Sequence, residues 1–134
     1  MTCSYTPVAT WRGSCHCGDV RFEADGAVEW AEVCNCSICA RKAYLHWYVP
    51  RERFRLLTPA ANLSTYRFGS GVAKHHFCRR CGVAAFYEPR SDRDKIDVNL
   101  RCVEGVSLEG VEIRRFDGQN WEEAHAATRG PAVP

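Results

Sequence analysis

Apolar and polar residues alternate along much of the chain, and a period of two is typical of β-strands that bury one face. Three segments show the alternation most clearly. Each segment places its apolar residues on one of its faces: Val20 and Phe22 in the first, Leu45, Trp47 and Val49 in the second, and Ile96, Val98 and Leu100 in the third. Pro50 predicts the end of the second segment, because proline cannot continue a central ladder. We expect all three stripes to lie in the core.

Shorter segments rich in β-branched and aromatic residues predict further strands. These lie at 28–33, 54–57, 64–68, 74–77, 83–88 and 111–116. The turn signal Asp25-Gly26 predicts that 28–33 returns beside a strand at 19–24, and Gly69-Ser70-Gly71 predicts a second hairpin. Helical signals are limited to one turn at 37–41 and a short helix at 121–126. The pattern predicts an all-β (mainly β) fold of small antiparallel sheets with short helical turns.

The length of 134 residues is typical of a single domain. Hydrophobic residues make up 46% and charged residues 25%, which argues against a disordered or fibrous chain. No apolar run approaches the roughly 20 residues of a membrane span, and the N-terminus lacks a signal-peptide pattern. We therefore expect a cytoplasmic protein without membrane contact. The net charge of +2, with both signs mixed, gives little support to nucleic-acid binding.

Nine cysteines are the unusual feature of the composition. An odd number cannot form a complete set of internal disulfides, and thiols stay reduced in the cytoplasm. Seven of the nine fall in three tight clusters: Cys15 and Cys17; Cys34, Cys36 and Cys39; and Cys78 and Cys81. Thiolates so spaced can converge on a metal ion, and zinc is the metal that such ligands favour. We expect Cys102 to be a buried thiol on the side of the stripe at 96–100.

The segment 77–82 is typical of a zinc knuckle, in which two sulfurs flank a tight turn and Gly82 takes a positive φ. A closed structural site needs four ligands, and Cys15 and Cys17 offer the second pair. The remaining trio matches a catalytic zinc site, in which three protein ligands leave one position open. Spacing alone does not force this division. The trio can also be closed by another cysteine (Cys3 or Cys102) or by a histidine.

Three stretches together carry a resemblance to a known family. They are Gly13-Ser14-Cys15-His16-Cys17-Gly18, Cys34-Asn35-Cys36-Ser37-Ile38-Cys39 and Phe77-Cys78-Arg79-Arg80-Cys81-Gly82. In this order they resemble the glutathione-dependent formaldehyde-activating enzyme family, which has the Mss4-like, zinc-stapled β fold. Details such as 74–78, 86–91 and 117–121 resemble its centromere-protein-V-like branch. We accordingly expect an N-terminal extension at 1–10, the zinc-binding domain at 11–126 and a frayed tail at 127–134.

The resemblance implies two zinc ions per chain. A structural zinc would lie on Cys15, Cys17, Cys78 and Cys81, and a catalytic zinc on Cys34, Cys36 and Cys39, where three ligands can leave the site partly occupied. The implied activity is that of a carbon–sulfur lyase, similar to S-hydroxymethylglutathione synthase, with the substrate thiol at the open zinc position. Its small-molecule partner would be a thiol or an aldehyde adduct, with glutathione as co-substrate and formaldehyde as the aldehyde.

A glutathione-like ligand carries two carboxylates, for which Arg41 and Lys42, directly after Cys39, are candidate partners. The alternative function is a non-catalytic zinc module that binds a protein partner or nucleic acid. A fourth protein ligand at the Cys34 site would favour that alternative, and an open position facing a cleft would favour catalysis.

Three histidines are less informative. His46 shares a strand face with Tyr44, and we expect a structural or surface role for it before a role in proton transfer. His75 and His76 are neighbours in a predicted strand, so at most one of them faces a given site.

Overall fold

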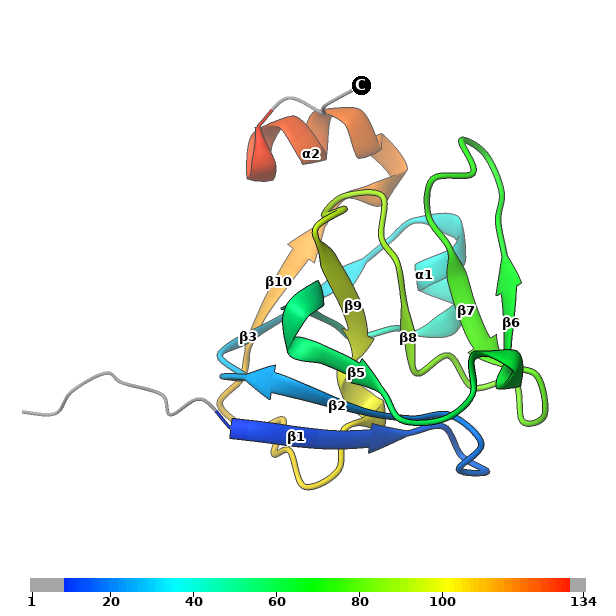
Figure 1. The fold of residues 1–134 in the computed structure, drawn as a ribbon. Helices are drawn as coiled ribbons and strands as arrows, with labels where there is room; N and C mark the ends of the chain where they lie inside the picture. Colours follow the sequence, from blue (N-terminus) through cyan, green and yellow to red (C-terminus); the bar gives the residue numbers. More distant parts are fainter. Residues whose placement is uncertain (1–8, 131–134) are drawn as a thin grey trace, which may run out of the picture.

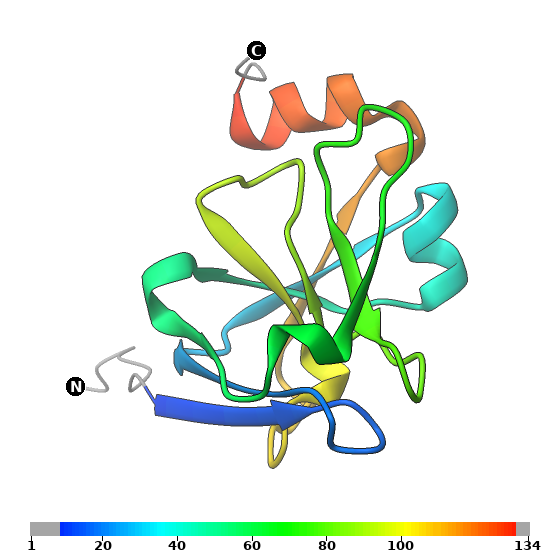
Figure 2. The same ribbon diagram turned by 45° about the vertical axis from the view of Figure 1, so that its right-hand side comes forward.

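A computed structural model describes residues 9–130 (Figures 1 and 2). The strands are β1 (Ala9–Ser14), β2 (Arg21–Gly26), β3 (Trp30–Cys34), β4 (His46–Pro50), β5 (Phe54–Leu56), β6 (Leu63–Tyr66), β7 (His75–Cys78), β8 (Phe86–Tyr87), β9 (Lys95–Asn99) and β10 (Glu112–Phe116). The α-helices are α1 (Ser37–Lys42) and α2 (Trp121–Arg129). Short 3-10 helices lie at Arg51–Arg53, Ala60–Asn62, Leu100–Cys102 and Gly118–Asn120. The fold is mainly β, as the alternating pattern predicts. Within residues 9–130, every helix is too short or too polar to span a bilayer.

The strands form three small sheets. One has the order β1-β2-β5, the largest has the order β10-β3-β4-β9-β8, and the third pairs β6 with β7. The β6–β7 pair is the hairpin that the glycine-rich turn at 69–71 predicts. In both views, α2 lies across one end of the largest sheet, close to the tip of the β6–β7 hairpin, and α1 lies to the side of that sheet (Figures 1 and 2).

The core lies between the three-stranded sheet and one face of the five-stranded sheet. Phe54 of β5 stacks there between Phe22 of β2, at 5.4 Å between ring centroids, and Phe86 of β8, at 4.7 Å. All three predicted stripes are buried in this core, which confirms them. Each of their larger side chains contributes about 1.5–3 kcal/mol when it is removed from water.

One predicted strand pairing and one predicted strand direction are wrong. The segment at 28–33 does not form a hairpin with β2, because β3 lies in the other sheet, between β10 and β4. The pair of β3 and β10 runs parallel, whereas we expected antiparallel sheets throughout. Both edges of β2 are occupied by β1 and β5. Local alternation specifies which face of a strand is buried, but it does not specify its partner strand.

The ends of the described chain also differ from the predicted elements. Strand β1 begins at Ala9, and α2 runs to Arg129 instead of ending at 126. The Arg129 guanidinium holds this last turn through ion pairs of 3.2 Å to Glu32 and to Asp92. Residues 1–8 and 131–134, including Cys3 and parts of the predicted extension and tail, lie outside the described residues.

Gly13 gives a test of the core packing. A Cβ at this position would lie 2.2 Å from the Phe22 ring and 2.8 Å from the backbone oxygen of Cys102. We expect Gly13→Ala to lower the free energy of unfolding by about 2–3 kcal/mol, because neither neighbour has room to move. Gly26→Ala is the matched control, since its Cβ would meet only Trp47, at 3.3 Å, and should cost less than about 1 kcal/mol. Equal urea midpoints for the two variants would contradict this packing.

Candidate functional site

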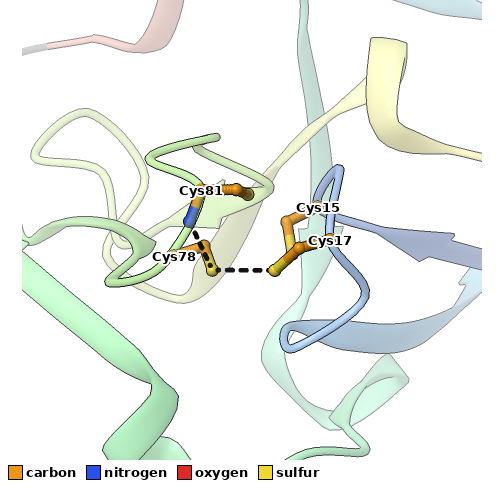
Figure 3. Close-up of side chains that lie close together, drawn as sticks. All are labelled: Cys15, Cys17, Cys78 and Cys81. Atoms are coloured by element: carbon orange, nitrogen blue, oxygen red, sulfur yellow. Dashed lines mark hydrogen bonds between the residues drawn. The ribbon is translucent and has the colours of Figure 1, made fainter.

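Four cysteine side chains from two distant loops meet in Figure 3. Cys15 and Cys17 come from the connection between β1 and β2, and Cys78 and Cys81 come from the end of β7 and the turn after it. All four Sγ atoms lie within 4.8 Å of one another. The sulfurs of Cys15 and Cys17 are 3.8 Å apart, and those of Cys17 and Cys78 are 3.6 Å apart. We call this group the four-cysteine cluster.

Backbone amides of both loops point at these sulfurs. The N–H of Val20 donates to Cys15 Sγ at 3.3 Å, and the N–H groups of Arg80 and Cys81 donate to Cys78 Sγ at 3.4 Å each. Gly82 has a φ of +80°, as the knuckle pattern predicts, and its N–H closes the turn. Amide hydrogen bonds stabilise thiolates, the form in which cysteine binds metal.

The four-cysteine cluster has the spacing of a closed zinc site. Four sulfurs in a tetrahedron, each about 2.3 Å from one ion, lie about 3.8 Å apart. The distances of 3.6 Å and 3.8 Å agree with this value and are much longer than the roughly 2.0 Å of a disulfide bond. All eight cysteines in the described part of the chain are free thiols. These residues therefore fit a zinc ion.

The second group, which we call the three-cysteine cluster, consists of Cys34, Cys36 and Cys39. Cys34 ends β3, Cys36 caps α1 and Cys39 lies within that helix. The backbone N–H of Cys36 donates to Cys34 Sγ, and that of Cys39 donates to Cys36 Sγ, both at 3.4 Å. Hydrogen bonds from the thiols of Cys34 and Cys39 hold the pKa of the Cys36 thiol well below its usual range.

The three-cysteine cluster gains no further ligand from residues 9–130, where no other Cys, His, Asp or Glu side chain joins it. Cys102, one of the predicted alternatives, lies 4.0 Å from the backbone oxygen of Ala84, and Cys3 lies outside the described residues. Three converging thiolates fit a zinc ion that accepts its fourth ligand from outside the described residues.

The 3-10 turn before α2 packs directly on the three-cysteine cluster. The N–H of Gln119 donates to the side-chain oxygen of Asn35 at 3.0 Å, which fixes the turn. A Cβ at Gly118 would lie 2.5 Å from Cys34 Sγ and 2.7 Å from Cys36 Cβ. Glycine is therefore required here for the close approach of the turn. The sequence marks this glycine only as a turn residue.

The three-cysteine cluster lines a cavity of about 460 Å³. The cavity is bounded by α1, by the tip of the β6–β7 hairpin and by the start of α2, which contribute Ile38, Phe68, Ser70 and Trp121 among others. Its volume is in the range of small-molecule sites. The four-cysteine cluster does not line this cavity.

The floor of the cavity is the second face of the five-stranded sheet. Alternation sends Trp47 and Val98 into the core, so their neighbours on β4 and β9 face the other way. On that face Glu32, His46, Tyr87 and Asp97 are all more than nine-tenths buried. Charged residues are seldom buried unless they are paired, so the buried charged side chains of this face are expected to have partners within it.

His46 and Asp97 form the central pair of this polar face. The Nδ1 of His46 lies 2.6 Å from Oδ2 of Asp97, and both side chains are almost fully buried. Burial alone would lower the pKa of His46, but the carboxylate outweighs burial and raises that pKa. Asp97, Glu32 and Tyr87 were not predicted from the sequence. For Asp97 and Glu32, the available signal was a charged residue between two apolar residues of a strand.

The two neighbouring histidines of β7 face opposite ways, as predicted. His75 lines the cavity and stacks on Phe68, at 5.5 Å between ring centroids, and on Tyr87, at 4.6 Å. His76 points away from the cavity, where its ring nitrogens lie 2.8 Å from Thr65 Oγ1 and 2.7 Å from Glu88 Oε2.

The two predicted carboxylate partners do not line the cavity. Arg41 is exposed and donates to the backbone oxygen of Ser37, 2.8 Å away in its own helix. Lys42 turns inward, where burial lowers its pKa. Arg90 lines the cavity instead, with its guanidinium stacked 3.6 Å from the centre of the Trp121 ring. Substrate binding by Arg41 and Lys42 stays a prediction.

Comparison with known proteins identifies a matching family and a similar solved structure. Residues 10–114 match the model of a family described as glutathione-dependent formaldehyde-activating enzyme. A crystal structure of a Rhodobacter sphaeroides protein, a structural genomics target, is similar, with 34% sequence identity and a TM-score of 0.70. That match covers 76% of this chain and 98% of the other chain. The centromere-protein-V-like branch stays a prediction.

Proposed function

The chain belongs to the glutathione-dependent formaldehyde-activating enzyme family, and we propose that it makes or breaks the carbon–sulfur bond between glutathione and an aldehyde such as formaldehyde. The observation that carries the proposal is the three-cysteine cluster in the wall of a cavity of about 460 Å³. The adduct formed there would be S-hydroxymethylglutathione. Thiol addition to an aldehyde conserves all atoms of the two reactants and involves no oxidation.

The cysteine clusters would hold the zinc ions that this activity uses. Cys34, Cys36 and Cys39 would hold the catalytic ion, which when bound supplies a position for a substrate thiol and lowers the pKa of that thiol. The four-cysteine cluster would hold a structural ion, since it lies outside the cavity and joins two distant loops.

The chain's own side chains would bind and orient the substrates. Phe68 and Trp121 present apolar surface that excludes water from the reacting groups. Arg90 offers a guanidinium, held by its stacking on Trp121, to a carboxylate of the ligand. Holding thiol and aldehyde side by side removes much of the entropic barrier of a bimolecular reaction. The absence of a fourth protein ligand among residues 9–130 supports this reading over a purely structural zinc module.

Zinc content and turnover test the proposal together. We expect elemental analysis to find two zinc ions in the native chain and one in Cys36→Ser, because two cysteines are too few to keep zinc in the three-cysteine cluster. NMR of the hydroxymethyl protons should show that the native protein speeds adduct exchange, and that Cys36→Ser falls to the uncatalysed rate. Cys102→Ser, outside both clusters, should match the native protein in both measurements. One zinc in both proteins, or a native rate equal to the rate without protein, would overturn the proposal.

A further inference from the structure

Two imidazoles line the same cavity as the three-cysteine cluster. His46 projects from β4 and His75 from β7, and they are 1% and 4% exposed. Both rings pack on Tyr87, at centroid distances of 5.9 Å and 4.6 Å. The Tyr87 ring stacks on His75 and meets His46 at a steep angle. Because both imidazoles line the cavity, both can contact the same small ligand.

The partner of His46 determines which of its nitrogens carries the hydrogen. Asp97 is fully buried, and its carboxylate accepts hydrogen bonds, so the His46 nitrogen 2.6 Å from it must be the donor. In the neutral ring the proton is then on Nδ1, and Nε2 carries a lone pair. That Nε2 is buried and has no hydrogen-bond partner in the described part of the chain. Leaving a buried nitrogen unpaired is unfavourable, and a ligand in the cavity that donates a hydrogen bond to it would remove that cost.

The partner of His75 has the opposite effect. The Nζ of Lys42 lies 3.4 Å from His75 Nδ1, and an ammonium group only donates, so Nδ1 must accept. The ring hydrogen of His75 is then on Nε2. Burial, reinforced by the positive charge of Lys42, lowers the pKa of His75 to about 4, so the ring is neutral at physiological pH.

We propose that the two imidazoles divide the proton transfer of the reaction, His46 Nε2 as the base and His75 Nε2–H as the hydrogen-bond donor to the aldehyde oxygen. This inference rests on the proposed function for its substrate, and on the two hydrogen bonds above for the assignment of roles. Asp97 and Lys42 are positioning residues, because each acts through the ring that it holds.

The step balances without a further reactant. The thiol proton passes to His46 Nε2 while the sulfur electron pair forms the bond to the aldehyde carbon. The π electrons of the carbonyl move to its oxygen, where the hydrogen bond from His75 stabilises the developing charge. The proton then passes from His46 to this oxygen and gives the hydroxyl of the adduct. In the reverse direction His46 removes the hydroxyl proton and returns it to the sulfur.

Nitrogen-15 NMR of the histidine rings tests the assignment without any turnover. In the zinc-loaded protein, at a pH above the raised pKa of His46, we expect the hydrogen of His46 on Nδ1 and that of His75 on Nε2. His76, which faces away from the cavity, provides a reference signal in the same spectrum. A hydrogen on Nε2 of His46, or on Nδ1 of His75, would overturn the inference whatever the activity.

Substitutions then test the roles. His46→Asn keeps an amide donor near the position of Nδ1, so the contact with Asp97 and the fold are retained while the base is lost. We expect kcat to fall about 10²–10⁴-fold with little change in KM. His75→Phe keeps the stacking but removes the donor, and should lower kcat about 10²-fold. His75→Gln restores an N–H near Nε2 and should recover most of that loss.

His76→Gln is the matched control, since it replaces an imidazole outside the cavity and should leave kcat unchanged. An unaltered kcat in His46→Asn, or equal losses in His75→Phe and His75→Gln, would overturn the inference while the proposed function stands. A second outcome separates the two proposals. If the native protein turns over no thiol–aldehyde pair while each neutral ring carries its hydrogen on the assigned nitrogen, the proposed function is overturned. The acceptor character of His46 Nε2 and the donor character of His75 Nε2–H are then still supported.

Discussion

Cys78→Ser should prevent the chain from folding stably. Cys78 is fully buried at the end of β7, and its sulfur belongs to the four-cysteine cluster, 3.6 Å from that of Cys17. A zinc ion there would tie the β1–β2 loop to the knuckle after β7. Structural zinc contributes about 10–16 kcal/mol in small zinc domains, whereas a whole domain is stable by only about 5–15 kcal/mol. The loss of one ligand therefore threatens the entire free energy of folding.

We expect Cys78→Ser to lower the free energy of unfolding by at least about 4 kcal/mol. In urea, the cooperative unfolding transition should be lost or shifted to a much lower midpoint. Removing zinc from the native protein with a chelator should give the same result. Cys102→Ser is the matched control. Its thiol is partly buried against the core and makes one weak hydrogen bond, 4.0 Å from the backbone oxygen of Ala84, so the substitution should cost less than about 1.5 kcal/mol. A Cys78→Ser protein with native zinc content and a native midpoint would show that the cluster is not a structural metal site.

The faces of the strands were predictable because burial follows the local alternation. The three stripes and the β6–β7 hairpin are found where the pattern places them. Strand β1 was missed, since its sequence, Ala9–Ser14, combines one large apolar residue, Trp11, with small and polar ones. The partners of β3 were also missed, because its parallel contact with β10 joins segments that are about eighty residues apart and depends on the whole fold.

The cysteines of the candidate site were predictable, whereas its floor was not. Thiolates at short spacing have few structural alternatives to metal binding. The structure groups them into the two clusters that the family resemblance implies, a division that spacing alone does not force. His46 and Asp97 occupy strand positions that ordinarily face water. They are buried because neighbouring tyrosines pack around them and because α1, the β6–β7 hairpin and the start of α2 enclose the cavity over this face, which is a long-range property. A sequence pattern cannot distinguish a covered polar face from a solvated one.

Gly118→Ala should abolish zinc binding by the three-cysteine cluster and leave the four-cysteine cluster intact. The added Cβ would lie 2.5 Å from Cys34 Sγ and 2.7 Å from Cys36 Cβ, distances at which one of the two loops must move. The backbone of Gly118 does not have a positive φ, so alanine is conformationally allowed and the clash alone causes the effect. A shift of about 1 Å in ligands or reacting groups is enough to cost about 10²-fold in rate.

We expect zinc to fall from two ions per chain to one in Gly118→Ala, and adduct exchange to fall at least about 10²-fold. Its urea midpoint should change far less than that of Cys78→Ser, because the four-cysteine cluster and the core are not touched. Gly26→Ala, which adds a methyl group away from both clusters, should keep both zinc ions and the native rate. Two zinc ions and native turnover in Gly118→Ala would contradict this prediction. They would mean that the turn can shift without cost and that its contact with Cys34 and Cys36 does not position these ligands.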